Sequence, residues 1–338
     1  MDLGVTNKAV GLEIDTGVVR AVEVSGTVRK PKLLNMASIS LADGAVEEGM
    51  VVQPKEVGEG LRELWSSGEI KHRNVLLGLS NQGVLVRYAT MPKVSPEKLE
   101  NVIKFHAQDH LPIAIENVVM DYQVIGETTE QDKTVLEVLL VAARRDMLDG
   151  FLEALSIANL EPVDIDVSTL ALQHTLPSVA NDRTVAVVNV ANGLSNILVS
   201  AQNNPRLARL VSVKLKDLAD SLGISLDEVL DINSRAEVET EQIFNAWTNN
   251  LISETRSSLT YYQNQANASE LEAIVFNGRG ARLKGLSAKL EEALGLPVRI
   301  VNPFNNFTNG SQKTEESGLE AIEYAICAGL ARRGLEGL

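Results

Sequence analysis

The chain has 338 residues, of which 44% are hydrophobic and 22% are charged, a composition typical of a folded globular protein rather than a disordered one. The 45 acidic and 31 basic side chains give a formal net charge of −14, which repels nucleic acid and anionic lipid headgroups. The single cysteine, Cys327, excludes an internal disulfide and is typical of the reducing cytoplasm.

The N-terminal stretch 1–10 has no basic region followed by an apolar segment, and the chain contains no run of about 18 apolar residues. We therefore expect neither a secretory signal nor a helix that spans a bilayer.

A strand–turn–strand–turn–strand pattern opens the chain at residues 10–41 and recurs at 185–215. Glu13 and Asn189 hold matching positions in the two copies. Two halves that each begin with the same meander predict a duplicated α/β core with a cleft between the halves.

The pattern changes between the two copies. It reads as strand (83–92), helix (95–111), strand (117–127), strand (134–144) and helix (145–159). This order predicts a small α+β module inserted into the first half. We expect three parts: a first half at 1–82 and 163–184, the module at 83–162, and a second half at 185–338.

The remaining segments complete the two halves. We expect helices at 51–65, 217–232, 238–265 and 319–335, short strands at 74–80 and 296–304, a strand running into a helix at 164–176, a strand–turn–helix unit at 270–295, and a loop at 305–318. The last helix is expected to pack back on the first half.

Three glycine-containing turns are candidates for binding nucleotide phosphates, because backbone N–H groups in such turns attract anions. The candidate residues are Asp15, Thr16, Gly17 and Arg20 in the first turn, Asn192, Gly193 and Ser195 in the second, and Gly278, Arg279 and Gly280 in the third. The alternative is that these are only turns.

Hydrolysis of ATP would also need a carboxylate for Mg²⁺. Glu13 and Asp15 are the only acids at the two tight turns, and Asn189 stands where the opposing acid is expected, so we assign no catalytic residue. His106 and His110 have a spacing that suits a metal, but no third ligand is evident, so we expect no metal site. We expect Cys327 to be a buried small hydrophobe.

Four segments resemble the PilM family, the actin-like proteins of type IV pilus assembly: 100–126, 136–172, 249–265 and 278–304. The resemblance spans nearly the whole chain. It implies an actin-like fold of the FtsA and PilM type, with a duplicated α/β core and an inserted small α+β subdomain.

The resemblance also implies a partner and a location. Family members bind the short cytoplasmic N-terminal segment of PilN, a single-pass inner-membrane protein, in a groove between the inserted module and the core. That would place this chain in the cytoplasm, at the inner face of the membrane, within reach of the pilus motor and platform proteins. The residues that we place near the groove are Val84, Val86, Tyr88, Leu99, Val102 and Ile103.

The three turns depart from the family pattern. Asp-Ile-Gly-Ser in the first turn is Glu13-Ile14-Asp15-Thr16 here, Asp-Ile-Gly in the second is Asn189-Val190-Ala191, and a triple glycine in the third is Gly278-Arg279-Gly280. The Asp15 side chain crowds the backbone, and its charge repels a nearby phosphate by about 1–4 kcal/mol in wet surroundings. We therefore expect a non-enzymatic scaffold with a degenerate nucleotide site.

Two alternatives stay open. One is an active ATPase that binds ATP with Mg²⁺ and whose nucleotide state regulates assembly, self-association included. The other is an FtsA-like division protein, which is disfavoured because no amphipathic membrane-binding helix follows the final segment 319–335.

Overall fold

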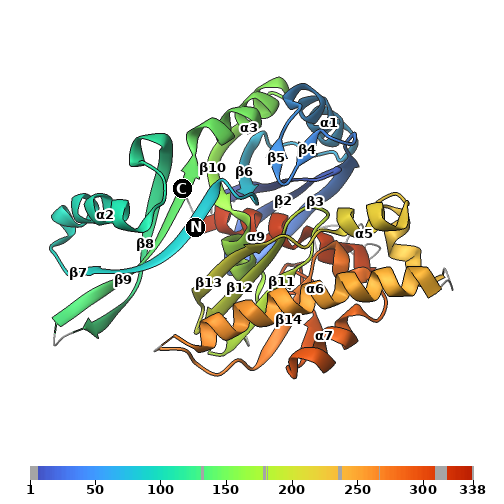
Figure 1. The fold of residues 1–338 in the computed structure, drawn as a ribbon. Coiled ribbons are helices and arrows are strands. Elements are labelled where there is room, and N and C mark those ends of the chain that lie inside the picture. The colour runs from blue at the N-terminus through green and yellow to red at the C-terminus, as the bar shows by residue number, and fades with distance from the viewer. Residues whose placement is uncertain are drawn as a thin grey trace. The chain divides into compact units, whose positions relative to one another are not determined.

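The computed structural model describes residues 7–130, 133–177, 180, 182–234, 238–265, 267–308 and 318–336. The chain divides into two compact units (Figure 1), a smaller one from Gln82 to Phe151 and a larger one built from the residues before and after it.

The first sheet of the larger unit has the strand order β10-β6-β1-β2-β3. Its first three strands form an antiparallel meander, and β6 and β10 continue the sheet in parallel from β1. The strands are β1 (Asn7–Asp15), β2 (Val18–Thr27), β3 (Lys30–Ser40), β6 (Asn74–Leu79) and β10 (Glu161–Val167).

The second sheet repeats this arrangement, with the order β13-β12-β11-β14-β15 and the same parallel and antiparallel pairings. The strands are β11 (Thr184–Asn189), β12 (Ser195–Ala201), β13 (Asn204–Val211), β14 (Ala273–Asn277) and β15 (Val298–Ile300). The duplication expected from the meanders is therefore present in the topology.

The register of the two sheets also matches at their ends. Glu13 is the last β1 residue paired with β6, and Asn189 is the last β11 residue paired with β14. The two residues thus occupy equivalent places, each just before the connection that reverses the chain.

Helix α9 (Ala325–Arg333) lies between the two sheets and contacts β1, β2 and β6. Every residue from Ala325 to Ala331 is buried, Cys327 included, because small side chains let the helix approach both neighbours closely. The single helix expected over 319–335 is divided, since a 3-10 helix at Gly318–Tyr324 precedes α9 and another at Gly334–Glu336 follows it. The Ile322 carbonyl accepts a hydrogen bond from the Gly278 N–H.

The other helices of the larger unit cover the sheets. They are α1 (Pro54–Ser67), α4 (Ser168–Ala171) with a 3-10 turn at Leu172–Thr175, α5 (Leu215–Leu222), a 3-10 helix at Glu228–Ser234, α6 (Val238–Gln263) and α7 (Leu286–Leu294); a short hairpin joins β4 (Val46–Glu47) to β5 (Met50–Val51). Helix α3 (Arg145–Ile157) begins in the smaller unit and ends in the larger one. The helix expected over 217–232 is interrupted because Gly223, with φ of 63°, ends α5 in the left-handed conformation.

The smaller unit is a three-stranded antiparallel sheet in the order β7-β9-β8, with one helix packed on it. Its elements are β7 (Val84–Pro92), α2 (Pro96–His110), a 3-10 turn at Ile115–Asn117, β8 (Val118–Glu130) and β9 (Lys133–Arg144). The predicted order of strands and helices is present. Of the loop expected at 305–318, residues 309–317 lie outside the described residues.

Candidate functional site

The first two candidate turns face each other at the ends of the two matching sheets. The turn between β1 and β2 holds Asp15, Thr16 and Gly17, and the turn between β11 and β12 holds Asn192 and Gly193. Since each turn lies at the same place in its own sheet, the duplication brings the two together.

The Asp15 carboxylate joins these turns directly. One of its oxygens, Oδ2, accepts a hydrogen bond from the Asn192 N–H at 3.0 Å. The other, Oδ1, accepts from the Gly193 N–H at 3.0 Å and from the Thr16 N–H at 2.8 Å. In return the Asn192 side-chain amide donates to the Thr16 carbonyl at 3.0 Å. We call this set of four hydrogen bonds the Asp15 bridge.

The bridge depends on a glycine at 193. A Cβ atom at that position would lie 2.7 Å from Asp15 Oδ1 and 2.8 Å from Thr16 Oγ1, closer than real Cβ contacts allow. Asp15 is 8% exposed and Asn192 is 1% exposed, so the bridge is shielded from water. Hydrogen bonds to a charged carboxylate are stronger in such surroundings than at the surface.

Two opposing influences act on the Asp15 carboxyl. Burial raises its pKa above the usual value, while Arg20 and the N–H donors of Thr16, Gly193 and Asn192 lower it. Both oxygens serve as acceptors, which fits the ionised form.

The Ser195 side chain binds a backbone carbonyl and does not line the cleft. It is fully buried, and its hydroxyl donates to the Val213 carbonyl at 2.5 Å. The sequence grouped it with residues that would line a ligand site; the structure places it beneath the second turn.

A chain of buried ion pairs lies beside the bridge. Arg20 contacts Glu13 at 3.4 Å and Glu323 at 3.0 Å, and Glu323 in turn pairs with Arg282. Arg20 is 3% exposed and Glu13 is 5% exposed. We call Glu13, Arg20, Glu323 and Arg282 the ion-pair chain. It connects β1 and β2 to the segments around the third turn and α9.

The side chains of the ion-pair chain differ in how firmly they keep their charge. Burial raises the pKa of Glu13 to about 7, and the nearby Asp15 charge adds to the rise, although Arg20 opposes it. Burial lowers the pKa of Arg20, but the carboxylates of Glu13, Glu323 and Asp15 outweigh burial and raise it above its usual value. Arg20 therefore stays charged, whereas Glu13 is poised to take up a proton near neutral pH.

In the wild type, the free energy of unfolding is expected to fall as pH rises from 4.5 to about 7. Glu13→Gln is expected to remove this fall. The folded protein holds the Glu13 proton up to about pH 7, while an ordinary glutamate in the unfolded chain releases it near 4.5. Since the unfolded state then binds fewer protons across this window, stability falls as pH rises through it. Urea unfolding at several pH values should show a shallower fall for Glu13→Gln than for the wild type. The exposed control Glu59→Gln should follow the wild type; an unchanged slope in Glu13→Gln would contradict the assignment.

The third turn packs against the end of β11. Gly278 adopts a φ of 77°, and a Cβ there would lie 2.6 Å from the Val190 carbonyl oxygen. The Gly280 N–H donates to that same carbonyl at 3.0 Å. Arg279 extends away from both and pairs with the exposed Asp227 at 2.6 Å. The third turn thus adjoins the end of β11, which leads into the second turn, and the Asp15 bridge joins the second turn to the first.

The six residues proposed for a partner groove lie on two sides of the smaller unit's sheet. Leu99 and Ile103 of α2 pack with the residues of one face, where Ile103 is fully buried, and Val102 is partly exposed on the same helix. Because side chains alternate along a strand, Val84, Val86 and Tyr88 point to the opposite face. These two sets do not form one continuous surface.

Strand β7 is an edge of this sheet, since it pairs only with β9 within the part of the chain that the structure describes. The Arg144 N–H donates to the Gly83 carbonyl, which places residue 83 in a hydrogen-bonded pair. In an antiparallel ladder such pairs alternate. The backbone groups that point outward, away from β9, are therefore those of the even-numbered positions, such as Val84, Val86 and Thr90. The Val86 carbonyl accepts a hydrogen bond from the Arg87 side chain, as an outward-pointing carbonyl would.

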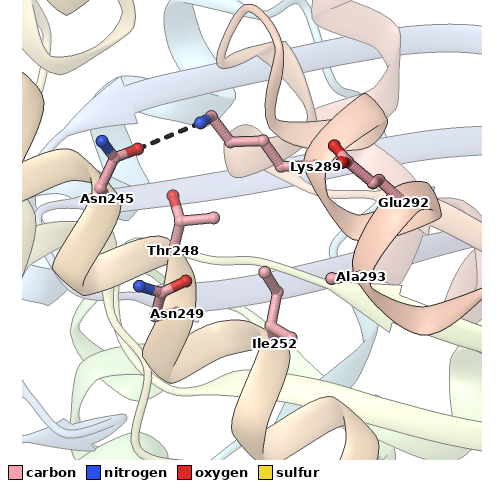
Figure 2. Close-up of a pocket in the computed structure, with 7 residues that line it drawn as sticks. All are labelled: Asn245, Thr248, Asn249, Ile252, Lys289, Glu292 and Ala293. Carbon is pink, nitrogen blue, oxygen red and sulfur yellow. Dashed lines mark hydrogen bonds between the residues drawn. The ribbon is translucent and has the colours of Figure 1, made fainter.

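A hollow of about 570 Å³ lies on the second half, between α6 and α7 (Figure 2). Figure 2 shows the Lys289 amine of α7 joined to the Asn245 side chain of α6, with Thr248 and Ile252 also on α6. None of the residues predicted from the sequence lines it.

Two further properties of the described residues bear on function. They contain no helix long and apolar enough to cross a bilayer. They also bring together no group of three or more His, Cys, Asp or Glu side chains suited to hold a metal ion.

Sequence reasoning missed Glu323 and Arg282. Glu323 lies 303 positions from Arg20, and nothing local marks it as a partner. A signal was present in the sequence: Glu323 is an acid just before the apolar run from Ala325 to Ala331, and an acid buried beside such a run is expected to have a cation nearby.

The chain matches a family model described as type IV pilus assembly protein PilM over residues 11–335. Among solved structures it is similar to one described as a PilM-PilN type IV pilus biogenesis complex, at 28% identity and a TM-score of 0.85, covering 97% of this chain and 98% of that one.

Two more distant structures share the fold alone. The ethanolamine utilization protein EutJ from Carboxydothermus hydrogenoformans has 15% identity and a TM-score of 0.52, covering 96% of this chain and 89% of that one. MreB 5 of Spiroplasma citri, bound to AMPPNP, has 10% identity and a TM-score of 0.50, covering 96% and 94%. The actin-like fold expected from the sequence is confirmed.

Proposed function

Because the chain belongs to the PilM family of type IV pilus assembly proteins, we propose that it is a non-enzymatic adaptor that binds the cytoplasmic N-terminal segment of a PilN-like inner-membrane protein. The observation that carries this proposal is the match to the PilM-PilN complex over 97% of the chain. Binding of this kind would hold the protein at the inner face of the membrane and connect it to the pilus machine.

The outward edge of β7 supports a mode of binding. An extended peptide that adds a strand to an exposed sheet edge gains main-chain hydrogen bonds for affinity and side-chain contacts on alternate positions for specificity. The outward backbone groups of Val84, Val86 and Thr90 offer such an edge, and Val84 and Val86 present apolar side chains on one face of it. We propose that the peptide pairs with this edge.

The Asp15 bridge supports the non-enzymatic part of the proposal. ATP with Mg²⁺ would need the N–H groups of Asn192 and Gly193 for its phosphates, and the Asp15 carboxylate already takes both. The acid at 13, which would hold the metal, is paired with Arg20. The residues present therefore do not fit a bound nucleotide, and we derive no step of hydrolysis from them.

Two titrations of the full-length protein test the proposal. A synthetic peptide of the partner's N-terminal segment should bind with measurable heat, whereas ATP with Mg²⁺ should give neither heat nor phosphate release above background. Absence of peptide binding would remove the adaptor role. ATP turnover that disappears in Asn189→Ala would instead favour an active ATPase.

A further inference from the structure

We infer that the backbone N–H groups of Thr16, Asn192 and Gly193 form an anion site for phosphate or pyrophosphate, and that Asp15 occupies this site from within the chain, so that the two halves of the core are fastened without a ligand. The inference rests on that part of the proposed function which assigns no nucleotide to these turns.

The first step is the geometry of the donors. Three N–H groups from two turns converge on the two oxygens of one carboxylate, at distances of 2.8 to 3.0 Å. Convergent backbone N–H groups of this kind make a concave site for an anion. The occupant here is a side chain from the opposite half of the core, and it reaches the site because residue 193 has no Cβ.

The second step is the supply of positive charge. Arg20 lies close enough to oppose the rise in the pKa of Asp15 that burial causes, and it also pairs with Glu13 and Glu323. The same place therefore holds an anion bound by N–H donors and a cation bound by carboxylates, all supplied by the protein. A bound phosphate with its metal ion would present the same two charges.

The third step concerns what the bridge does. Asp15 and Thr16 belong to the first half, while Asn192 and Gly193 belong to the second, so three of the four hydrogen bonds cross between the two halves. Removing the carboxylate leaves the N–H groups of Asn192 and Gly193 buried without acceptors, which is costly unless another anion or water takes its place. An added anion of suitable size is then expected to bind where the carboxylate was.

The test is the thermal midpoint of the full-length protein with and without inorganic pyrophosphate, in the absence of Mg²⁺. Asp15→Gly is expected to lower Tm by at least about 4 °C, and about 10 mM pyrophosphate should restore at least about half of that loss. The wild type should not respond. Asp43→Asn, which removes an exposed acid and changes the net charge by the same amount, should also not respond.

Asp15→Asn provides a second variant of nearly the same shape and is measured in the same way if Asp15→Gly does not fold. An unchanged Tm in both variants would overturn the inference, as would an equal response to pyrophosphate in the wild type and the variants. These outcomes are distinct from failure of the adaptor role, which is read from peptide titration of the wild type alone.

Discussion

Arg20→Met is expected to lower the free energy of unfolding by about 3–5 kcal/mol, the usual cost of leaving buried charges without their partner. Arg20 neutralises Glu13 and Glu323, and all three side chains are at most one-tenth exposed. Methionine fills a similar volume but supplies no charge, so the two carboxylates would face each other across an apolar side chain. Denaturant unfolding monitored by circular dichroism measures the change.

Two controls separate this effect from a general loss of an ion pair. Lys104→Met breaks the exposed pair with Glu100, where both side chains are more than half exposed, and should leave the unfolding midpoint unchanged. A triple variant that adds Glu13→Gln and Glu323→Gln to Arg20→Met should recover much of the lost stability, because no buried charge then lacks a partner. A fully stable Arg20→Met protein would show that the ion-pair chain contributes nothing net.

Val86→Pro is expected to weaken binding of the partner peptide at least about tenfold, equivalent to about 1.4 kcal/mol. Proline removes the outward N–H of Val86 and places a ring where the added strand would lie. The ladder to β9 should keep its hydrogen bonds, since the groups at this position point away from β9. Calorimetric titration of the full-length variant with the peptide measures the loss.

The matched control is Val86→Thr, which keeps the N–H and the β-branched shape and should bind nearly as well as the wild type. Arg87→Pro serves as a contrast, because it removes an N–H that points to β9 and should destabilise the smaller unit itself. Undiminished binding by a folded Val86→Pro protein would place the peptide elsewhere than on the β7 edge.

Local sequence patterns were enough for much of the fold. The alternation in the two meanders, with Glu13 and Asn189 at matching places, predicted a duplication that the strand pairing contains. The ends of the helices were harder to predict from the sequence. Gly223 ends α5 within a stretch whose apolar pattern would continue the helix. The Ile322 carbonyl accepts a hydrogen bond from the Gly278 N–H, which comes from a distant part of the chain. Neither event is visible in the periodicity of the segment itself.

The candidate site, like the fold, could be predicted from the sequence only in part. The sequence placed Asp15 in the first turn and predicted that its charge would repel a phosphate, since that argument needs only the residue and its position. It did not reveal where the carboxylate goes. The answer depends on Asn192 and Gly193, which lie 177 and 178 positions away.

The sequence by itself determined the family, the duplicated core, the inserted module and the unusual residues in the three turns, because these follow from short-range patterns and from the order of segments. Only the tertiary structure decided that Asp15 binds the opposite turn, that Arg20 is held between Glu13 and Glu323, and that the groove candidates lie on two faces of a sheet. Hydrogen bonds and ion pairs form between whichever groups the fold brings within about 3 Å, and for groups far apart along the chain the sequence alone does not give that distance.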